Sequence, residues 1–464
     1  MNNFLKRVGI KNPTFRLLTI QNLVVDRLIE PPLDGNHGEL HPKTDDLVDS
    51  GIPFIMASDL SEGEVDFSSC NYITQTQAEK LRKGFAREGD VLLTHKATIG
   101  RTAIVQSNEY PYIMLTPQVT YYRVIDRSLL NNRYLRYFFE SDFFQRTLEL
   151  WAGSGSTRAY LGISAQRRLP VILPPIEIQS QIASILSAYD DLIENNKRRI
   201  AILEKMAEEI YREWFVRMRF PGHENVKFVK GVPEGWTVKK LDEVIEDIID
   251  YRGITPAKLG FDWESGNEGV IALSALNVKD GELIKLADAK RVSRTLYDRW
   301  MRKKLKVFDI LLTSEAPLGQ VYMLFGETEY VLSQRLFAIR ADNRQLPAVY
   351  LYHYFLFEIG KSQLAARATG STVGGIRQSL LREVEVLLPE RILLERYLSL
   401  TLPLINECHL LRLQINILTT TRDLLLPRLI TGMLPIEKIS PECSHLDVTI
   451  DESSKTYRTD VINA

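Results

Sequence analysis

Two histidines spaced four residues apart form a cluster with a capacity for metal chemistry. His37 and His41 belong to the segment HGELH, and on a helix this spacing would bring both rings to one metal ion. His37 and Glu39 also match the opening of a zinc deaminase signature, but the Pro-Cys-x-x-Cys half is absent from the sequence. The surrounding PPLDGNHGELHPK is rich in turn-forming residues, which argues against a helix. We therefore expect a polar loop that packs locally or contacts nucleic acid, and no metal site.

Signatures of other catalytic sites are also absent from the sequence. It contains no GxxxxGK(S/T) phosphate loop, no GxSxG elbow and no (D/N)PP(Y/F/W) tetrapeptide. No glycine-rich strand–turn that would hold a methyl donor is present either. Asp90 and Asp309 each precede a short apolar segment, and we expect them to end turns rather than act as paired catalytic acids. The sequence thus predicts no catalytic, cofactor-binding or metal-ligating residue.

Basic side chains gather locally on a chain whose net charge is only −1. Residues 290–306 carry eight lysines and arginines against the single acid Asp298, and residues 79–101 form a milder basic segment. A local positive field attracts phosphate groups even on a neutral chain, because charge interactions are screened beyond about 8–10 Å. The alternative is a solvated helix face. Both interpretations stay open on these charges alone.

The same order of short sequence blocks occurs twice. GDVLLTHKATIGRTAIV at 89–105 matches FDILLTSEAPLGQVYML at 308–324, and each is followed by an aromatic segment, a Gly-Ser-Thr segment and a long helical pattern. Such self-similarity at a long period indicates two duplicated domains rather than a solenoid. The matched pairs are Asp90 with Asp309, Thr94 with Thr313, Gly100 with Gly319, Gln118 with Gln334, and 155–157 with 370–372.

Each copy is predicted to have a mixed α/β fold. GDVLLT and FDILLT are short apolar segments typical of buried strands, with a turn expected at Gly100 or Gly319. Aromatic residues at helical spacing predict a core-facing helix, and Gly-Ser-Thr is typical of a turn followed by a helix N-cap. The helix-spaced aromatic residues are Tyr134, Phe138, Phe139 and Phe143.

Long helices are predicted after each copy. Residues 176–220 contain neither proline nor glycine, and a helix from Ile176 to Trp214 would be about 58 Å long. In the second helix we expect Pro403 to kink the first part and Pro427 to kink the end. Each helix bears one narrow apolar stripe, so we expect the two to pack on each other as an intramolecular coiled coil. The alternatives are that each lies on its own domain or binds another protein. The residues expected at this packing are Ile182, Ile185, Tyr189, Leu192, Ile200, Leu203, Leu404, Leu411, Ile415 and Leu418.

The chain of 464 residues is long enough to contain several domains and segments. We expect the protein to occur in a reducing compartment. No run of 18 apolar residues or apolar signal core appears, and the three cysteines form no CxxC pair, so we expect a cytoplasmic protein without a membrane span. The predicted segments are a first domain (1–175), a central helix (176–220), a second domain (221–389), a distal helix (390–434) and a polar tail (435–464).

These blocks resemble the specificity (S) subunit of type I restriction–modification enzymes. Each half resembles a target recognition domain, carried by GIPFIMASDLSEGEVDF with GDVLLTHKATIGRTAIV in the first half and by GWTVKKLDEVIEDIIDYRGITP with FDILLTSEAPLGQVYML in the second. The two long helices resemble the central and distal conserved regions. The resemblance covers about 15–434. The second copy departs from the pattern, because Glu390 stands where the first copy has Pro175 and its helix contains Pro403.

The resemblance implies a non-catalytic subunit that reads double-stranded DNA. Each domain would read one half of a bipartite, asymmetric site, with the domains related by a pseudo-two-fold axis. The helices would pack antiparallel, set the distance between half-sites and dock two copies of a methyltransferase (M) subunit. Adenine methylation, translocation and cleavage would belong to M and restriction (R) subunits, together with S-adenosylmethionine, ATP and Mg²⁺.

Side chains on loops and turns are the expected readers of DNA. Arginine and lysine suit guanine, asparagine and glutamine suit adenine, and lysine also suits phosphate. Two domains that read different sequences should differ at the reading positions. Lys96 against Glu315 and Arg101 against Gln320 meet this criterion, whereas the pairing of Gln118 with Gln334 favours a structural role. The candidates are His37, Lys96, Thr98 and Arg101 in the first domain, Arg252, Lys258 and Gln320 in the second, and Lys303 and Lys304 for phosphate.

Two other functions remain open from the sequence. One is an enzyme with an unrecognised site, and the other is a coiled-coil scaffold that joins proteins without reading DNA. Sequence-specific DNA binding by the assembled complex would distinguish a DNA reader from the scaffold.

Overall fold

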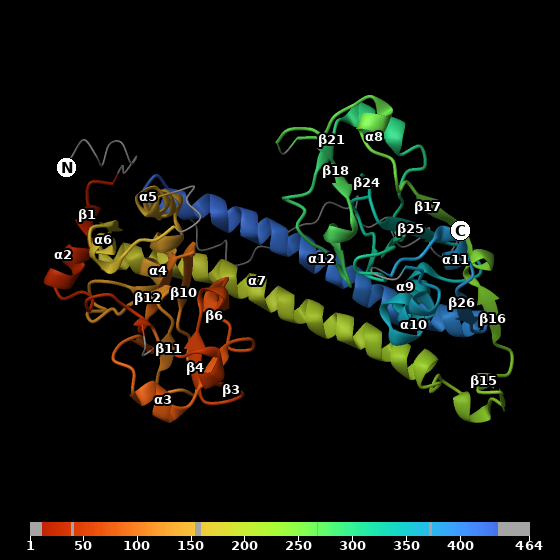
Figure 1. Ribbon diagram of the computed structural model, residues 1–464, viewed down its shortest axis with the longest axis horizontal. Coiled ribbons are helices and arrows are strands. Elements are labelled where there is room, and N and C mark those ends of the chain that lie inside the picture. The colour runs from red at the N-terminus through yellow and green to blue at the C-terminus, as the bar shows by residue number, and fades with distance from the viewer. Residues whose placement is uncertain (1–11, 39–40, 154–158, 267, 371–373, 435–464) are drawn as a thin grey trace. The chain divides into compact units, whose positions relative to one another are not determined.

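The structure is a computed structural model that describes residues 12–38, 41–153, 159–266, 268–370 and 374–434 (Figure 1). These residues form two compact units. Unit 1 comprises the described residues of 1–195 and those from 414 onward, and unit 2 comprises the described residues of 196–413. Three predicted parts lie outside the described residues. They are the Gly-Ser-Thr segment at 155–157, residues 371–372 of the second such segment, and the tail at 435–464.

Unit 1 contains a six-stranded mixed sheet beside a five-stranded sheet. Along the first sheet the order is β2-β12-β9-β10-β6-β5, with β10 parallel to β6 and the other neighbours antiparallel. The strands of this sheet are β2 (Leu33–Asp34), β12 (Val119–Tyr122), β9 (Val91–Lys96), β10 (Thr98–Ile104), β6 (Gly63–Val65) and β5 (Leu60–Ser61). The second sheet contains β3 (Leu47–Val48), β7 (Asn71–Ile73), β4 (Ile52–Ile55), β11 (Ile113–Leu115) and β8 (Phe85–Ala86), and β1 (Arg16–Thr19) pairs with β13 (Pro170–Leu173).

Two short helices cover the first sheet of unit 1. The Asn131 side chain accepts a hydrogen bond from the Tyr134 amide and starts α4 (Asn132–Glu140), and Ser141 caps α5 (Asp142–Ala152) in the same way. The prediction of a core-facing aromatic stripe is confirmed, because Tyr134, Phe138 and Phe139 are fully buried. Phe143 is half-buried against the same core. The other short helices of this unit are α2 (Ile20–Val25), α3 (Gln75–Glu79) and α6 (Ile163–Gln166).

Unit 2 repeats this plan with fewer strands. Its main sheet has the order β17-β25-β22-β23, and every neighbouring pair is antiparallel. These strands are β17 (Ile245–Asp250), β25 (Leu336–Ala341), β22 (Ile310–Thr313) and β23 (Val321–Met323). The smaller sheets contain β21 (Arg291–Val292), β18 (Val270–Leu273) and β24 (Val331–Leu332), β19 (Val278–Lys279) with β20 (Glu282–Leu283), β16 (Thr237–Lys240) with β26 (Glu385–Leu388), and β14 (Phe228–Val229) with β15 (Val232–Pro233). The short helices are α8 (Arg294–Trp300), α9 (Ala348–Leu356), α10 (Glu358–Ala366) and α11 (Gln378–Arg382).

A buried ion pair stands at the same place in both units. Arg123 donates two hydrogen bonds to Asp90 in unit 1, and Arg340 donates two to Asp309 in unit 2. Both aspartates also accept a backbone amide three residues back, so the predicted turn is confirmed at Asp90 and Asp309. The pairing with arginine has no local signal in the sequence, because the partners are more than 30 residues apart.

The strand registers correct one predicted pair. Val119 lies opposite Thr94, and Leu336 lies opposite Thr313, so the residues just before them are equivalent. Gln118 therefore corresponds to Arg335 and not to Gln334. Consistent with this, the carbonyl oxygens of Gln118 and Arg335 accept from the equivalent amides of His95 and Ser314. The predicted pairing of Gln118 with Gln334 is wrong, so it gives no argument for a structural role.

The long helices are α7 (Ile176–Tyr211), followed by one π-helical turn (Arg212–Val216), and α12 (Arg391–Ile430). The boundary between the units falls inside both, after Asn195 and after Leu413. Within unit 2 the Tyr211 and Tyr397 rings lie 6.2 Å apart, and the Cys408 thiol lies 3.9 Å from the Ile200 carbonyl oxygen. Later residues of α7 thus meet earlier residues of α12, so the helices run antiparallel. No helix in the described part of the chain has the length and apolar composition needed to cross a membrane.

One detail of the predicted helix packing differs from the structure. Leu192 is 47% exposed, so its predicted place in the packing is wrong, and the adjacent Ile193 is buried instead. α12 is one helix that includes both Pro403 and Pro427. The other residues predicted to pack are buried or half-buried, namely Ile182, Ile185, Tyr189, Ile200, Leu203, Leu404, Leu411, Ile415 and Leu418.

His353 makes the stability of unit 2 dependent on pH. Burial lowers the pKa of this histidine from its ordinary 6.5 to about 4. The unfolded chain therefore binds the proton first, and stability is fully present above pH 6.5 and falls as the pH decreases toward 4. We expect a loss of about 2 kcal/mol in the free energy of unfolding per such histidine from pH 7 to pH 5. Denaturant unfolding at both pH values should show a smaller loss for His353→Gln, and the surface variant His223→Gln should retain the wild-type loss.

Candidate nucleic-acid interface

The predicted DNA-reading residues of unit 1 lie on and around the β9–β10 hairpin. Its turn contains Ala97 with a φ of +64° and Gly100 with a φ of +92°. The Thr94 hydroxyl accepts the amide of Arg101 at 2.9 Å, which fixes the bulge after the turn. Lys96 and Thr98 flank Ala97, and both side chains are exposed. The backbone therefore presents these side chains to solvent while their strands stay in the sheet.

Unit 2 builds the equivalent turn with different side chains. Ala316 and Gly319 have φ values of +51° and +83°, and the Thr313 hydroxyl accepts the Gln320 amide at 2.9 Å. Glu315 stands in the place of Lys96 and is 3.0 Å from the Arg335 guanidinium. One backbone frame thus carries a lysine in unit 1 and an ion-paired glutamate in unit 2.

A buried carboxylate organises the cationic side chains of unit 1. Asp34 is 3% exposed at the end of β2 and accepts hydrogen bonds from the Lys83 ammonium and from His37 Nε2, the latter at 2.7 Å. Burial alone would raise the pKa of Asp34, but the hydrogen bonds from Lys83 and His37 outweigh it and hold the pKa below its ordinary value. Asp34 thereby fixes the Lys83 ammonium and the His37 ring in place. Lys83 is not among the residues predicted from the sequence, although it lies in the milder basic segment.

A neutral histidine lies beneath this cluster. His95 is fully buried, and its Nδ1 is 2.8 Å from the Thr120 hydroxyl. Its Nε2 lies 3.9 Å from the Asp34 carboxylate and has no hydrogen-bond partner among the described residues. Burial lowers the pKa of His95 to about 4. Tyr160 is exposed and its backbone pairs with that of Lys96. The Tyr160 ring covers His95, with the two ring centres 5.8 Å apart.

The remaining candidates of unit 1 lie apart from Asp34. The Arg101 guanidinium donates to the carbonyl oxygens of Ala57 and Ser58 at 3.2 and 3.3 Å. Its side chain therefore lies over the short 3-10 helix Ala57–Asp59. At the ends of the described part of HGELH, the His41 amide donates to the Gly38 carbonyl, and residues 39–40 lie outside the described residues. His37 is engaged by Asp34, and no group of three potential metal ligands occurs within the described residues.

Arg252 of unit 2 is held inside the fold. Its guanidinium makes two hydrogen bonds to the Asp250 carboxylate, at 2.9 and 2.8 Å, and lies 3.9 Å above the Phe337 ring. Asp250 ends β17 opposite Phe337, and Asp34 ends β2 opposite Thr120, so the two aspartates occupy equivalent positions. Both units thus anchor a cationic side chain on a carboxylate at this strand end.

The other candidates of unit 2 also have partners within the fold. The Gln320 side-chain oxygen accepts the Asp280 amide at 3.2 Å, and the exposed Lys258 donates to the Gly253 carbonyl at 2.6 Å. The Lys303 ammonium pairs with Asp247. Lys304 lies 3.6 Å above the Tyr297 ring and 2.5 Å from Asp298.

Aromatic side chains line the basic segment of unit 2, which the sequence did not indicate. Lys290 lies 4.9 Å above the Trp263 ring, and Arg299 lies 5.7 Å above the Phe261 ring. Cations on aromatic faces keep their charge at the surface while their side chains are held in place. This segment can therefore present ordered positive charges to a phosphate backbone.

Comparisons with known proteins agree with this arrangement. The sequence model described as the type I restriction modification DNA specificity domain matches residues 36–205. The type I restriction enzyme MjaIX specificity subunit of Methanocaldococcus jannaschii is 26% identical over 397 residues, covering 84% of this chain and 88% of that protein. The putative MjaX specificity subunit of the same organism is 22% identical over 353 residues, covering 73% and 77%.

A solved structure shares the fold. The S subunit of a type I restriction–modification system from M. genitalium has a TM-score of 0.54 and 15% identity, covering 90% of this chain and 97% of that one. The match to this solved structure extends over most of both chains, so it includes the duplicated sheets and the two long helices of this chain. Over most of its length the chain is similar to type I restriction–modification specificity subunits, and residues 36–205 match the DNA specificity domain of that family.

Proposed function

We propose that this chain is the DNA-recognition subunit of a type I restriction–modification complex. Each unit reads one half of a bipartite, asymmetric site in double-stranded DNA. The long helices set the spacing between the half-sites and dock two M subunits, and a pseudo-two-fold relation between the units belongs to this proposal. Methylation of adenine, and any translocation or cleavage by R subunits, takes place on those partners with their own S-adenosylmethionine, ATP and Mg²⁺.

The observation that carries the proposal is the duplicated hairpin with exchanged side chains. Ala97 and Ala316 adopt the same left-handed backbone, and the two threonine–amide hydrogen bonds have the same length of 2.9 Å. A reader of two different half-sites needs one frame that presents different hydrogen-bonding groups to base edges. Lys96 against Glu315 meets that need.

Lys96 also suits this role because other basic side chains lie near it and add to the local positive charge. Lys96 directly follows the buried His95, and the Asp34 carboxylate that binds Lys83 lies 3.9 Å from the His95 ring, so the two lysines lie on either side of this histidine in unit 1. Cations at such a point attract phosphate and position the hairpin, whereas base edges are read by individual side chains. Both contributions are available here from neighbouring residues.

Giving unit 1 the hairpin residues of unit 2 should change what it reads. We expect Lys96→Glu together with Arg101→Gln to reduce methylation of the native target by about 100-fold in a complex with the M subunit, because each base-edge interaction that is removed costs about 1–3 kcal/mol. Methylation would be measured on duplexes that carry the native target or have one half-site altered. The double variant should lose its preference for the first half-site and keep that for the second.

Lys227→Glu provides the control, since Lys227 is exposed near β14 and outside both hairpins. It changes the charge in the same sense and should leave the preference unchanged. If the double variant discriminated both half-sites as well as the wild type, the hairpin would not read DNA. Complexes that bind the M subunit but show no sequence preference at all would favour the scaffold function.

A further inference from the structure

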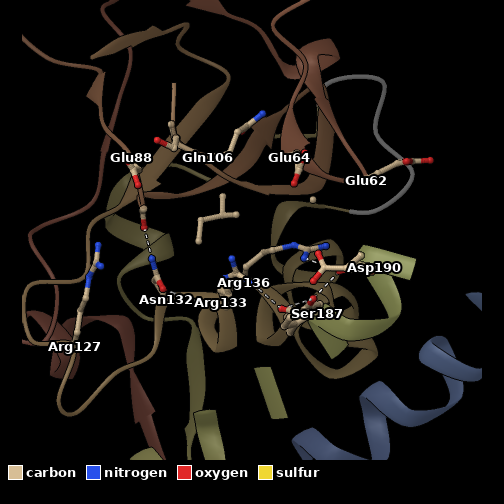
Figure 2. A pocket seen from close by; sticks show the side chains of 17 residues that line it. Glu62, Glu64, Glu88, Gln106, Arg127, Asn132, Arg133, Arg136, Ser187 and Asp190 are labelled. Atoms are coloured by element: carbon tan, nitrogen blue, oxygen red, sulfur yellow. Dashed lines mark hydrogen bonds and ion pairs between the residues drawn. The ribbon is translucent and has the colours of Figure 1, made fainter. Parts of the chain in front are cut away.

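A cavity of about 370 Å³ in unit 1 is lined by residues of the first sheet, of α4 and of the long helix α7 (Figure 2). Arg136 of α4 reaches along its wall toward Asp190 of α7, and Ser187 lies beside that carboxylate. Arg136 is 7% exposed although its guanidinium is charged. A charge buried to this degree requires close partners, and their identities show what the cavity wall connects.

The Arg136 guanidinium bridges two carboxylates. Its Nη2 donates to Glu140 at 2.9 Å and its Nη1 donates to Asp190 at 3.0 Å. The guanidinium carbon lies 4.5 Å from the centre of the Tyr137 ring, and the Tyr137 hydroxyl donates to Asp190 at 2.6 Å. Such charge-assisted bonds fix both distance and direction between the elements that carry them. Here they join α4 to α7.

Asp190 extends the connection to the second long helix. Its other carboxylate oxygen accepts from Arg422 of α12 at 2.6 Å. Burial would raise the pKa of Asp190, but the charge of Arg136 and hydrogen bonds from Tyr137 and Arg422 hold it below its ordinary value. One ionised carboxylate therefore ties α4, α7 and α12 together within unit 1.

Glu140 extends the connection in the opposite direction, to the reading hairpin. The Thr102 hydroxyl of β10 donates to Glu140 at 2.9 Å, on the same oxygen that Arg136 uses. Thr102 directly follows Arg101, the candidate reader. A continuous path of hydrogen-bonded side chains thus runs from the hairpin strand through α4 to both long helices.

Gly63 is shaped to accommodate the guanidinium. A Cβ atom at Gly63 would lie 1.9 Å from Arg136 Nη2, and the residue has a φ of +81°. The Gly63 backbone pairs with Ala103 of β10, next to Thr102. The turn at Gly63 therefore closes directly over the charged group and leaves it no room to move.

Unit 2 has different chemistry at the equivalent positions. The Tyr134 and Tyr350 hydroxyls donate to the equivalent carbonyls of Ile172 and Leu387, so Arg136 corresponds to Tyr352 and Glu140 to Leu356. Tyr352 and Leu356 line a cavity of about 170 Å³. Gly281 has a φ of +80° like Gly63, but a Cβ there would lie 3.6 Å from the Tyr352 hydroxyl. At these two positions an aromatic and an apolar side chain replace the ionic ones, while Arg412 of α12 pairs with Glu204 of α7 in the same cavity wall.

We propose that Arg136, with Glu140, Asp190, Thr102 and Arg422, is a positioning network that fixes the reading sheet of unit 1 on the two long helices. The proposal rests on the proposed function and adds residues that hold the direction of the first reader. Because DNA advances about 3.4 Å per base pair, a sheet that shifts on its helices accepts sites with a different spacer. The network thereby contributes to the selection of spacer length.

The test uses the complex with the M subunit and duplexes whose spacer is native, one base pair shorter or one base pair longer. We expect Arg136→Met to lower the ratio of methylation rates on native and altered spacers by about 100-fold, since misplacement by about 1 Å has effects of this size. Arg136→Lys, which keeps the charge, should restore part of the ratio. A merely destabilised protein would lose activity on all duplexes alike and keep the ratio.

Two matched controls separate positioning from folding. Arg123→Met removes the buried partner of Asp90 in the same unit without touching the long helices, and it should keep the wild-type ratio. Gly63→Ala and Gly281→Ala introduce the same backbone strain, but only the first meets Arg136, so only the first should lower the ratio. If Arg136→Met does not fold, Gly63→Ala tests the same network, because its added Cβ meets the Arg136 guanidinium.

The outcomes distinguish the two proposals. An unchanged ratio in both Arg136→Met and Gly63→Ala, or an equal fall in Arg123→Met, would overturn the positioning network and leave the proposed function intact. A wild-type complex that methylates without any two-part target would overturn the proposed function, and the positioning network with it.

Discussion

Arg340→Met should lower the free energy of unfolding of unit 2 by about 3–5 kcal/mol, because it leaves a buried carboxylate without its partner. The Asp309 side chain is 1% exposed and receives two hydrogen bonds from Arg340, at 2.8 and 2.6 Å. Arg340 also donates to the Lys304 carbonyl at 2.9 Å. Denaturant unfolding followed by tryptophan fluorescence would measure the change, since four of the five tryptophans lie between 214 and 300.

The matched control is Arg344→Met, which removes the pair with Asp342. The Arg344 side chain is 77% exposed, so the expected loss is below about 1 kcal/mol. Replacing both partners, as Asp309→Leu with Arg340→Met, should recover part of the stability because no charge is then left buried. If Arg340→Met and Arg344→Met lost equal stability, burial of the Arg340–Asp309 pair would not account for the loss.

Replacing His37 and Lys96 should have the largest effect on DNA binding. We expect His37→Gln with Lys96→Gln to weaken specific binding by the M-containing complex by about 100-fold or more, since each well-placed interaction with a base contributes about 1–3 kcal/mol. Lys83 is kept so that Asp34 retains a charged partner. Dissociation constants measured over a range of salt concentrations would test this, and the salt slope should fall by about one for each phosphate that the variant no longer neutralises.

Lys227→Gln with Lys230→Gln controls for the loss of positive charge. Both lysines are exposed near β14, away from the hairpins. This pair should change specific and nonspecific binding little. Equal weakening by both double variants would show that His37 and Lys96 act only through the overall charge of the chain.

The duplication and the long helices were predictable because their signals are local. Short apolar strands, helical spacing of Tyr134 and Phe138, and an uninterrupted stretch after 176 are written in neighbouring residues. Local patterns do not determine which face of a helix turns inward at every position. Leu192 shows this, because it belongs to the stripe by spacing but is exposed where Ile193 is buried.

The sites depend on contacts that span long stretches of sequence. Asp34 and Lys83 are 49 residues apart, and Asp190 and Arg422 are 232 apart, so neither pair has a local signature. The equivalence of Gln118 with Arg335 follows from the strand register, whereas the predicted pairing with Gln334 is offset from it by one residue. Reading candidates such as Lys96 were found from differences between copies, whereas the groups that hold them in place were not.

Selection of a two-part DNA site by this chain can be measured in a living cell. The chain and its M subunit would be produced in a bacterial host without adenine methylation of its own, and every N6-methyladenine in the genome would be mapped. We expect one motif of two short parts separated by a fixed spacer, methylated on both strands, that disappears when this chain is left out. Methylation at a continuous motif, or the same map with and without the chain, would show that the chain does not select a two-part site.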